Sequence, residues 1–406
     1  MTSREKFVEG TLHSARHGIQ ATSHVVEGVH HAVLDSLRRY NPFMGRQPHL
    51  TRGVYRAIRG ATTLLGMGGA RVMEWVNDLP VEGEAAPRLL KPWQLHWMSG
   101  FNAAWGDFFE EEGHAWAMPM GFARGDDPAV FSAGLPDWLP AEPSPHLVVF
   151  IHGLGMNEFA WRDKSGSSFA DQLAQEFDCQ PLMLRYNSGL PIHDNGELLA
   201  HRLETLVNDY PRPVQSLTLV GHSMGGLISL SAGHYGRGSE QRWTTLLRGQ
   251  VCLGSPHQGA NLEVAGNWFT DLLGKTPWSA PFSLVGRRRS AGIKDLRHGS
   301  LRAEDWQERD RDEVLHFHPH CVKMLPNAHY LLVASALAQV EGSKLENSVG
   351  DGLVTPDSAL QPRFLEVNNT RISRQRLRGI SHLALLTHPA VYQALRGWYQ
   401  EQIRPS

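Results

Sequence analysis

One five-residue turn constrains this chain more than any other feature. The segment Gly221–Gly225 spells G-x-S-x-G, after the apolar run SLTLV and before the helical run LISLSAG. This order predicts a strand, a sharp turn and a helix, and the glycines let neighbouring backbone pass without a Cβ clash. We therefore expect the Ser223 hydroxyl to project above a sheet, near the positive end of a helix that can stabilise a developing oxyanion.

The rest of the chain alternates between strand-like and helical patterns. Strands are predicted at 146–151, 181–186, 216–221, 249–254 and 330–336, and helices near 167–177, 195–209, 224–234 and 390–402. The alternation predicts an α/β fold with a mostly parallel sheet and helices on both faces. The aromatic-rich segment 101–124 is predicted to form an opening β-hairpin.

A serine becomes a nucleophile when a histidine takes its proton and an acid orients that histidine. In a fold with this turn, the acid and then the histidine follow the serine along the chain. The candidate acids are Asp351 and Asp357, in the loop VGDGLVTPDSA. Asp351 lies between two glycines, where a tight turn can lift a carboxylate toward the site, whereas Asp357 follows a proline and suits a turn cap. This favours Asp351.

The candidate bases are His382 in GISHLALLTH and His388 in THPAVYQAL. His388 precedes Pro389 at the start of a predicted helix, with Thr387 as the N-cap, which is a sufficient structural role. His382 lies in the preceding loop and is favoured as the base.

An oxyanion hole needs two backbone donors, one after the nucleophile and one from the loop after the first core strand. Met224 follows Ser223, and the sequence His152, Gly153, Leu154, Gly155 follows the apolar run 146–151. The amides of Met224 and Leu154 are therefore the predicted donors.

Several of these segments together resemble a known family. They are HGLG at 152–155, GHSMGG at 221–226, LGSPHQGANLE at 253–263, DGLVTPDSA at 351–359 and SHLALLTHPAVYQALRGWY at 381–399. Over about residues 100 to 402 the chain resembles bacterial lipases and the related GPI inositol-deacylase-like hydrolases of the α/β-hydrolase superfamily. The resemblance implies an α/β-hydrolase fold, Ser223 as nucleophile, Asp351 as orienting acid and His382 as general base, with the loop of Gly254, Pro256 and His257 beside the site.

The predicted activity is hydrolysis of a carboxylic ester, as an esterase or lipase, through an acyl-enzyme and without a cofactor or metal. The substrate is a small-molecule or lipid ester. Acyl transfer, or hydrolysis of a polyester or amide, would use the same residues and stays an alternative. A non-catalytic scaffold is a further alternative, which the presence of all three residue types disfavours.

Two regions lie outside this core pattern. Residues 1–90 carry apolar residues at helical spacing and are predicted to form a helical arm, with a catalytic domain at 91–406. An ordinary packing role is favoured for the arm, and peripheral contact with a membrane is the alternative. A lid-like insert is predicted at about 261–326, where Trp268, Phe269 and Trp278 would suit an apolar substrate.

Composition excludes several classes of protein. The formal charge is -2, from 39 basic and 41 acidic residues, so no global charge attracts nucleic acid or an anionic bilayer. The cysteines are Cys179, Cys252 and Cys321, an odd number at wide spacing that does not suggest a disulfide framework. No signal-peptide pattern or membrane-length apolar run is present, so a cytoplasmic location is expected.

Two further motifs have ordinary explanations. The segment HFHPHC at 316–321 carries metal-capable side chains, but Pro319 interrupts a strand ladder and a solvated loop is favoured. The arginine triplet 287–289 could meet an anionic head group, and a solvated surface is favoured.

Overall fold

The structure, a computed structural model, describes residues 92–113, 117–127, 131–260, 290–307, 320, 322–340, 349–362, 365–366 and 371–403. All of these belong to one compact unit, made of Leu89–Ala265 and Arg289–Ser406. The predicted helical arm at 1–90 lies outside the described residues, as does much of the predicted insert, including the arginine triplet 287–289.

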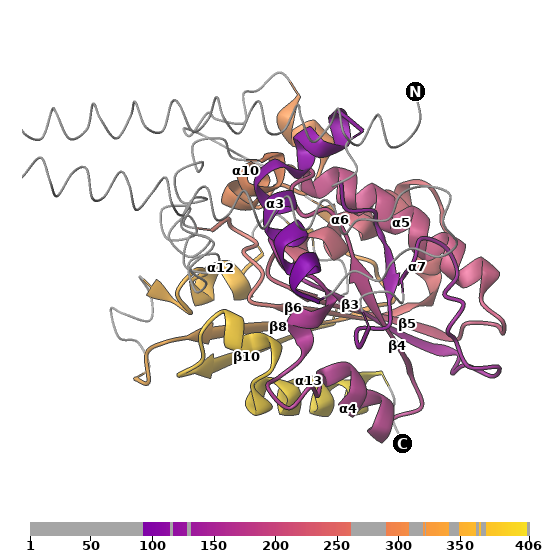
Figure 1. Cartoon of the computed structure of the whole chain (residues 1–406). Coiled ribbons are helices and arrows are strands. Elements are labelled where there is room, and N and C mark those ends of the chain that lie inside the picture. Colours follow the sequence, from indigo (N-terminus) through magenta and orange to yellow (C-terminus); the bar gives the residue numbers. More distant parts are fainter. Residues whose placement is uncertain are drawn as a thin grey trace, which may run out of the picture. The chain divides into compact units, whose positions relative to one another are not determined.

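An eight-stranded sheet forms the centre of the described unit, in the order β10-β8-β6-β5-β3-β4-β1-β2 (Figure 1). The strands from β10 to β4 run parallel, and β1 pairs antiparallel with both β4 and β2. Their bounds are β1 Gly121–Ala123, β2 Phe131–Ser132, β3 His146–Ile151, β4 Gln180–Arg185, β5 Ser216–His222, β6 Leu247–Leu253, β8 His329–Ala336 and β10 Arg371–Arg378. A separate two-stranded sheet pairs β7 (Val322–Lys323) with β9 (Leu365–Glu366).

Helices cover both faces of this sheet (Figure 1). The helices α4 and α13 lie on one face, and α5 and α6 lie on the other with α3 and α10. Their bounds are α3 Pro92–Glu111, α4 Phe169–Glu176, α5 Ile192–Asp209, α6 Met224–Gly238, α7 Trp243–Leu246, α10 Ala291–His298, α12 Pro356–Leu360 and α13 Pro389–Gln402, with 3-10 turns η1 Glu158–Trp161, η2 Ala303–Trp306 and η3 Leu383–Leu386. The predicted α/β architecture, a mostly parallel sheet with helices on both faces, is therefore confirmed. No described helix has the length and apolar character that a membrane span requires.

The central strands form because their apolar runs are buried from both sides. In β3, every residue from Leu147 to Ile151 is at most 1% exposed, which is typical of a parallel strand between two helical layers. The helices supply amphipathic faces and caps. The helix α4 begins with a capping box in which Ser168 and Asp171 each bond the other's backbone.

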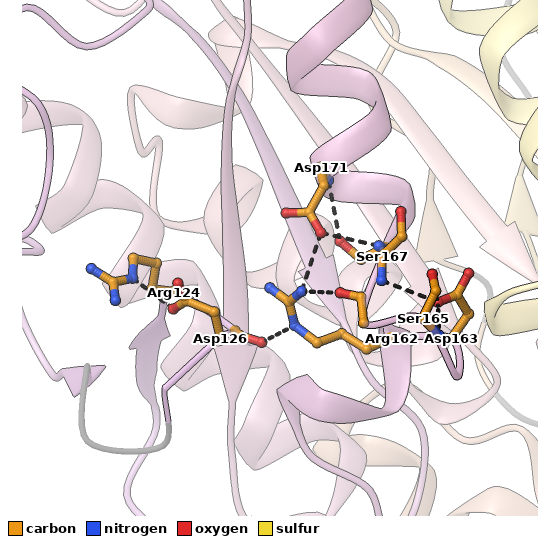
Figure 2. A network of polar contacts seen from close by, with 10 residues as sticks. Arg124, Asp126, Arg162, Asp163, Ser165, Ser167 and Asp171 are labelled. Carbon is orange, nitrogen blue, oxygen red and sulfur yellow. Dashed lines mark hydrogen bonds and ion pairs between the residues drawn. The ribbon is translucent and has the colours of Figure 1, made fainter.

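A polar network fixes the connection between β3 and β4 (Figure 2). The guanidinium of Arg162 donates to the carbonyl oxygens of Gly125 and Gly166 and to the carboxylate of Asp171. Since Asp171 also caps α4, this network ties the end of η1 to the start of that helix and to the segment after β1. The same connection opens with the glycine turn at 153–155.

The predicted hairpin at 101–124 is wrong. Residues up to Glu111 belong to the helix α3, and only Gly121–Ala123 form a strand. Leu95, Met98 and Asn102 are buried at helical spacing along α3, so the buried face of this segment follows a helical period and not an alternating one.

The strand β10 was also absent from the sequence prediction. It carries arginine at 371, 374, 376 and 378, and none of its residues is buried. It is the last strand in the described part of the sheet and pairs with β8, and a charged edge strand of this kind protects a sheet from pairing with other chains. An apolar pattern therefore could not reveal it.

Candidate active site

The predicted site residues meet at the carboxyl edge of the parallel strands. Gly153 follows β3, Ser223 follows β5, and Gly254 follows β6. Asp351 and His382 come from the loops after β8 and β10. Neighbouring parallel strands end at the same edge, which is where open α/β sheets bind their ligands.

Ser223 has a strained backbone conformation. Its φ of 53° and ψ of -121° lie in a region that side chains with a Cβ rarely adopt. Its amide donates to the carbonyl of Leu253 at 2.8 Å, which fixes the turn against the end of β6. Of the described non-glycine residues, only Ser223 and Glu240 have positive φ. Strain of this kind persists where the surrounding structure imposes it, often at a functional site.

The glycine of the turn allows α6 to begin directly against β3. A Cβ built on Gly225 would lie 2.3 Å from the carbonyl oxygen of Ile151 and 2.5 Å from that of His152. Both neighbours are backbone atoms, so they cannot rotate away as a flexible side chain could. Glycine at this position is therefore required by the packing of the helix on the strand.

His382 and Asp351 form a buried hydrogen-bonded pair. The Nδ1 of His382 donates to Oδ2 of Asp351 at 2.8 Å, and the two side chains are 2% and 1% exposed. The backbone amide of His382 also donates to the carbonyl of Asp351 at 3.0 Å. Two bonds between the same residues fix the plane of the imidazole and leave Nε2 as the nitrogen that can accept a proton.

The Asp351 carboxylate is held by its own loop. Its Oδ1 accepts from the amides of Leu353 at 3.0 Å and Val354 at 2.9 Å. Gly350 has a φ of +58°, and a Cβ there would lie 2.0 Å from the carbonyl oxygen of Val354. The flanking glycine thus permits the tight turn that the sequence predicted.

Close contacts also place the His382 ring beside the serine turn. A Cβ on Gly254 would lie 3.2 Å from both Cε1 and Nδ1 of His382, and the preceding residue Leu253 accepts the Ser223 amide. On the other side, the rings of His222 and His382 have centroids 4.7 Å apart. The structure therefore brings Ser223, Asp351 and His382 to one place.

The predicted oxyanion loop lies against the same turn. A Cβ on Gly153 would lie 3.2 Å from the Ser223 Cβ, so the loop after β3 lies closer to the serine than most side chains would allow. The amide of Gly155 donates to Oγ of Ser188 at 3.0 Å, and that of Met156 to the carbonyl of Gly153 at 3.3 Å. These bonds occupy the two amides that directly follow Leu154 and fix the turn there.

A buried aromatic pair, His152 and Tyr186, packs at the start of this loop. The ring of His152 stacks on Tyr186 at 4.2 Å, and the Tyr186 hydroxyl donates to the carbonyl of His152 at 2.8 Å. Burial lowers the pKa of His152 to about 3. The hydrogen bond to the Gly153 carbonyl raises this pKa and the nearby Arg185 guanidinium lowers it, but burial has the larger effect. His152 is therefore neutral at neutral pH and acts as a packing element.

The less favoured candidates have structural roles. Asp357 is exposed in the first turn of α12, where its Oδ1 accepts from the Gln361 side chain at 3.1 Å. His388 is itself the N-cap of α13, accepting from the amide of Ala390. The sequence had assigned that cap to Thr387, which is one residue too early.

Sequence reasoning gave no role to His222, the residue between Gly221 and Ser223. Its side chain is fully buried, and its Nε2 lies 3.0 Å from the backbone carbonyl oxygen of His382. Burial, and then the adjacent His382, lower the pKa of His222 well below its ordinary value. Its position in the turn was the only available signal, because a sequence does not show which carbonyl a side chain reaches.

A metal centre finds no support in the part of the chain that is described. No group of three or more histidine, cysteine, aspartate or glutamate side chains there is arranged to hold an ion. Of the segment 316–321 only His320 is described, and it bonds the buried carboxylate of Asp305 through its backbone amide and Nδ1. Its other metal-capable residues, His316, His318 and Cys321, lie outside the described residues.

Comparison with known proteins gives a family and a set of similar structures. The model of the Alpha/beta hydrolase family matches residues 148–394. The mature form of the Bacillus licheniformis lipase BlEst2 is 19% identical with a TM-score of 0.40, covering 65% of this chain and 95% of that chain. The product of the Listeria innocua gene lin2722 is 18% identical with a TM-score of 0.38, over 64% and 94%.

A lipase-esterase related protein from Clostridium acetobutylicum is 12% identical with a TM-score of 0.37, over 69% of this chain and 98% of that chain. At these identities and scores, none of the three structures indicates which substrate this chain takes. No curated protein matches the chain.

Proposed function

Because this chain belongs to the α/β-hydrolase family, we propose that it is a serine hydrolase that cleaves carboxylic esters. Ser223 is the nucleophile, His382 the general base and Asp351 the acid that orients it. The observation that carries the proposal is the buried hydrogen bond between His382 and Asp351, beside a serine whose φ is 53°. Burying a charged pair has a desolvation cost, so such a pair adds little net stability to the fold. Its presence therefore favours a role in proton transfer over a role in packing alone.

In the acylation half, His382 Nε2 takes the Ser223 hydroxyl proton as Oγ attacks the ester carbonyl carbon. The carbonyl oxygen becomes an oxyanion, which the amides of Met224 and Leu154 stabilise. The tetrahedral species then collapses, the carbon–oxygen bond to the alcohol breaks, and the alcohol leaves with the proton from His382. Asp351 stays a hydrogen-bond acceptor and stabilises the imidazolium that forms between these steps.

In the deacylation half, water replaces the alcohol. His382 takes a proton from the water as its oxygen attacks the acyl carbon, and a second oxyanion forms in the same place. When this species collapses, Ser223 Oγ recovers the proton and the carboxylic acid leaves. The cycle returns every group to its starting state and needs no electron acceptor or metal.

The position of Met224 supports the oxyanion role. It is the first residue of α6, and its side chain is fully buried. Amides in the first turn of a helix have no partner within the helix, so they are free to bond a ligand, and the helix dipole favours negative charge there. A Cβ on Gly153 would lie 3.2 Å from the Ser223 Cβ, and this closeness supports the amide of the next residue, Leu154, as the second donor.

The test is hydrolysis of p-nitrophenyl esters from acetate to palmitate by the parent and by Ser223→Ala. We expect the parent to be active and Ser223→Ala to lose on the order of 10⁵- to 10⁶-fold in kcat. Ser239 is exposed at the C-terminal end of α6, the helix that follows Ser223. Ser239→Ala is the matched control and should keep full activity. The chain-length optimum would separate an esterase from a lipase, and a folded parent that is inactive toward every ester would contradict the proposal.

A further inference from the structure

A hydrogen bond joins His222, at the end of β5, to His382, in the loop after β10. The Nε2 of His222 lies 3.0 Å from the carbonyl oxygen of His382, and the residues are 160 positions apart in the chain. A carbonyl oxygen only accepts, so Nε2 carries the hydrogen and donates. This fixes the tautomer of His222, with Nδ1 unprotonated.

The surroundings of His222 keep its ring neutral and closely packed. Its Nδ1 is buried and has no hydrogen-bond partner among the described residues, and a Cβ on Gly153 would lie 3.0 Å from that atom. The Trp161 ring meets it edge to face, with centroids 6.4 Å apart. No acidic side chain among the described residues contacts it, so the ring has no partner that would favour the charged form.

The bond from His222 acts on the backbone of His382. Its side chain is fixed by Asp351, and its amide also bonds the Asp351 carbonyl. Both bonds tie His382 to the acid loop, and neither ties it to the serine turn. The bond from His222 does so directly, because the residue after His222 is Ser223.

We propose that His222 is a positioning residue that sets the distance between the Ser223 hydroxyl and the His382 imidazole, through its bond to the His382 carbonyl. This inference rests on the proposed function for its catalytic meaning. The bond itself is a structural property that can be measured without turnover.

The first arm of the test compares His222→Leu, which removes the donor, with His222→Gln, whose terminal amide nitrogen can replace Nε2. A displacement of about 1 Å between reacting groups costs on the order of 10²-fold. We therefore expect His222→Leu to lower kcat by ~10- to 100-fold with little change in KM, and His222→Gln to recover most of the loss. Equal kcat in all three proteins, or an equal loss in both variants, would overturn the proposal.

The second arm uses nuclear magnetic resonance of imidazole nitrogens in protein labelled with ¹⁵N-histidine, recorded on the parent and on both variants. The signal that is absent from both variants belongs to His222. Between pH 5 and 8 we expect it to be the signal of a neutral imidazole protonated at Nε2. We also expect His222→Leu, and not His222→Gln, to shift the signal of the His382 Nδ1 proton.

The two arms separate this proposal from the proposed function. A parent that hydrolyses no ester but gives the expected spectra would contradict the ester-hydrolase function and support the bond from His222. An active parent whose His382 signal is the same in all three proteins would leave the function standing and overturn the role of His222. Thermal melting of each variant establishes that it is folded.

Discussion

The two sides of the candidate site are built by different kinds of contact. On the acid–base side, Asp351 and His382 are held by hydrogen bonds between side chains and loop amides. On the elbow side, formed by the turn Gly221–Gly225 and the loop after β3, Gly225 places the helix α6 by close backbone packing with no room for a Cβ, and Gly153 lies against the serine turn with less space than most Cβ atoms have. Changes on the acid–base side should therefore affect proton transfer while the fold persists, whereas changes on the elbow side should affect folding itself.

The largest expected effect tests the acid–base side. In Asp351→Asn, the side-chain oxygen is expected to keep the bonds from Leu353 and Val354, so the amide nitrogen would face His382 Nδ1. That forces Nδ1 to accept and moves the hydrogen to Nε2, which can then no longer take the serine proton. We expect kcat to fall on the order of 10⁴-fold with an almost unchanged melting temperature.

Asp357→Asn is the matched control, because that side chain is exposed and six residues further along the same loop and helix. It should leave kcat unchanged. If Asp351→Asn retained activity while Asp357→Asn lost it, the assignment of the acid would be wrong.

The next effect tests the elbow side through stability. In Gly225→Ala, the new Cβ would overlap backbone oxygens of Ile151 and His152. Overpacking of this kind typically costs ~1–3 kcal/mol, and more where the backbone cannot shift. We expect a clear drop in the midpoint of urea or thermal unfolding.

Gly238 lies at the other end of the same helix, and nothing within 4 Å would meet a Cβ there. Gly238→Ala should therefore be neutral or stabilise by up to ~1 kcal/mol, because alanine has the higher helix propensity. Equal stability of the two variants would contradict the steric account of the elbow.

A smaller effect is expected from pH. Burial lowers the pKa of His152 to about 3 and that of His257 to about 4, while an unfolded histidine titrates near ~6.5. Between the folded and unfolded pKa values the unfolded chain binds more protons than the folded chain. The free energy of unfolding therefore has its full value above pH ~6.5 and decreases as the pH falls toward the pKa values of the folded protein. Each group can contribute up to ~1.4 kcal/mol per pH unit within its window.

The check is the melting temperature from pH 7.5 to pH 4.5 for the parent and for His257→Met, which lacks one of these groups. We expect the parent to melt at lower temperature as the pH falls, and the variant to show a shallower dependence. Identical slopes would indicate that His257 takes up its proton without unfolding.

Sequence reasoning was strongest where a residue's role follows from local chemistry. Apolar runs such as 146–151 predicted the buried strands, the glycines around Asp351 predicted its turn, and the family match agrees with the predicted superfamily. The finer resemblance to GPI inositol-deacylase-like hydrolases stays a prediction, as do the division near residue 90 and the cytoplasmic location.

Sequence reasoning was weakest where the role of a residue depends on its tertiary surroundings. The aromatic residues of α3 have high strand propensity and so predict a hairpin, whereas tertiary packing makes the segment a helix. The edge strand β10 carries charge in place of an apolar pattern. The bond of His222 joins segments that are distant in the chain, so no spacing rule could predict it.

The central claim is that Ser223 is a nucleophile activated by His382, and covalent labelling tests it most directly. The parent, Ser223→Ala and His382→Gln would each be treated with a fluorophosphonate ester, and their intact masses and peptide maps recorded. We predict one adduct on the parent, located at Ser223, no adduct on Ser223→Ala, and labelling slowed by several orders of magnitude in His382→Gln. An adduct at another residue, or labelling of Ser223→Ala at the parent's rate, would contradict the account.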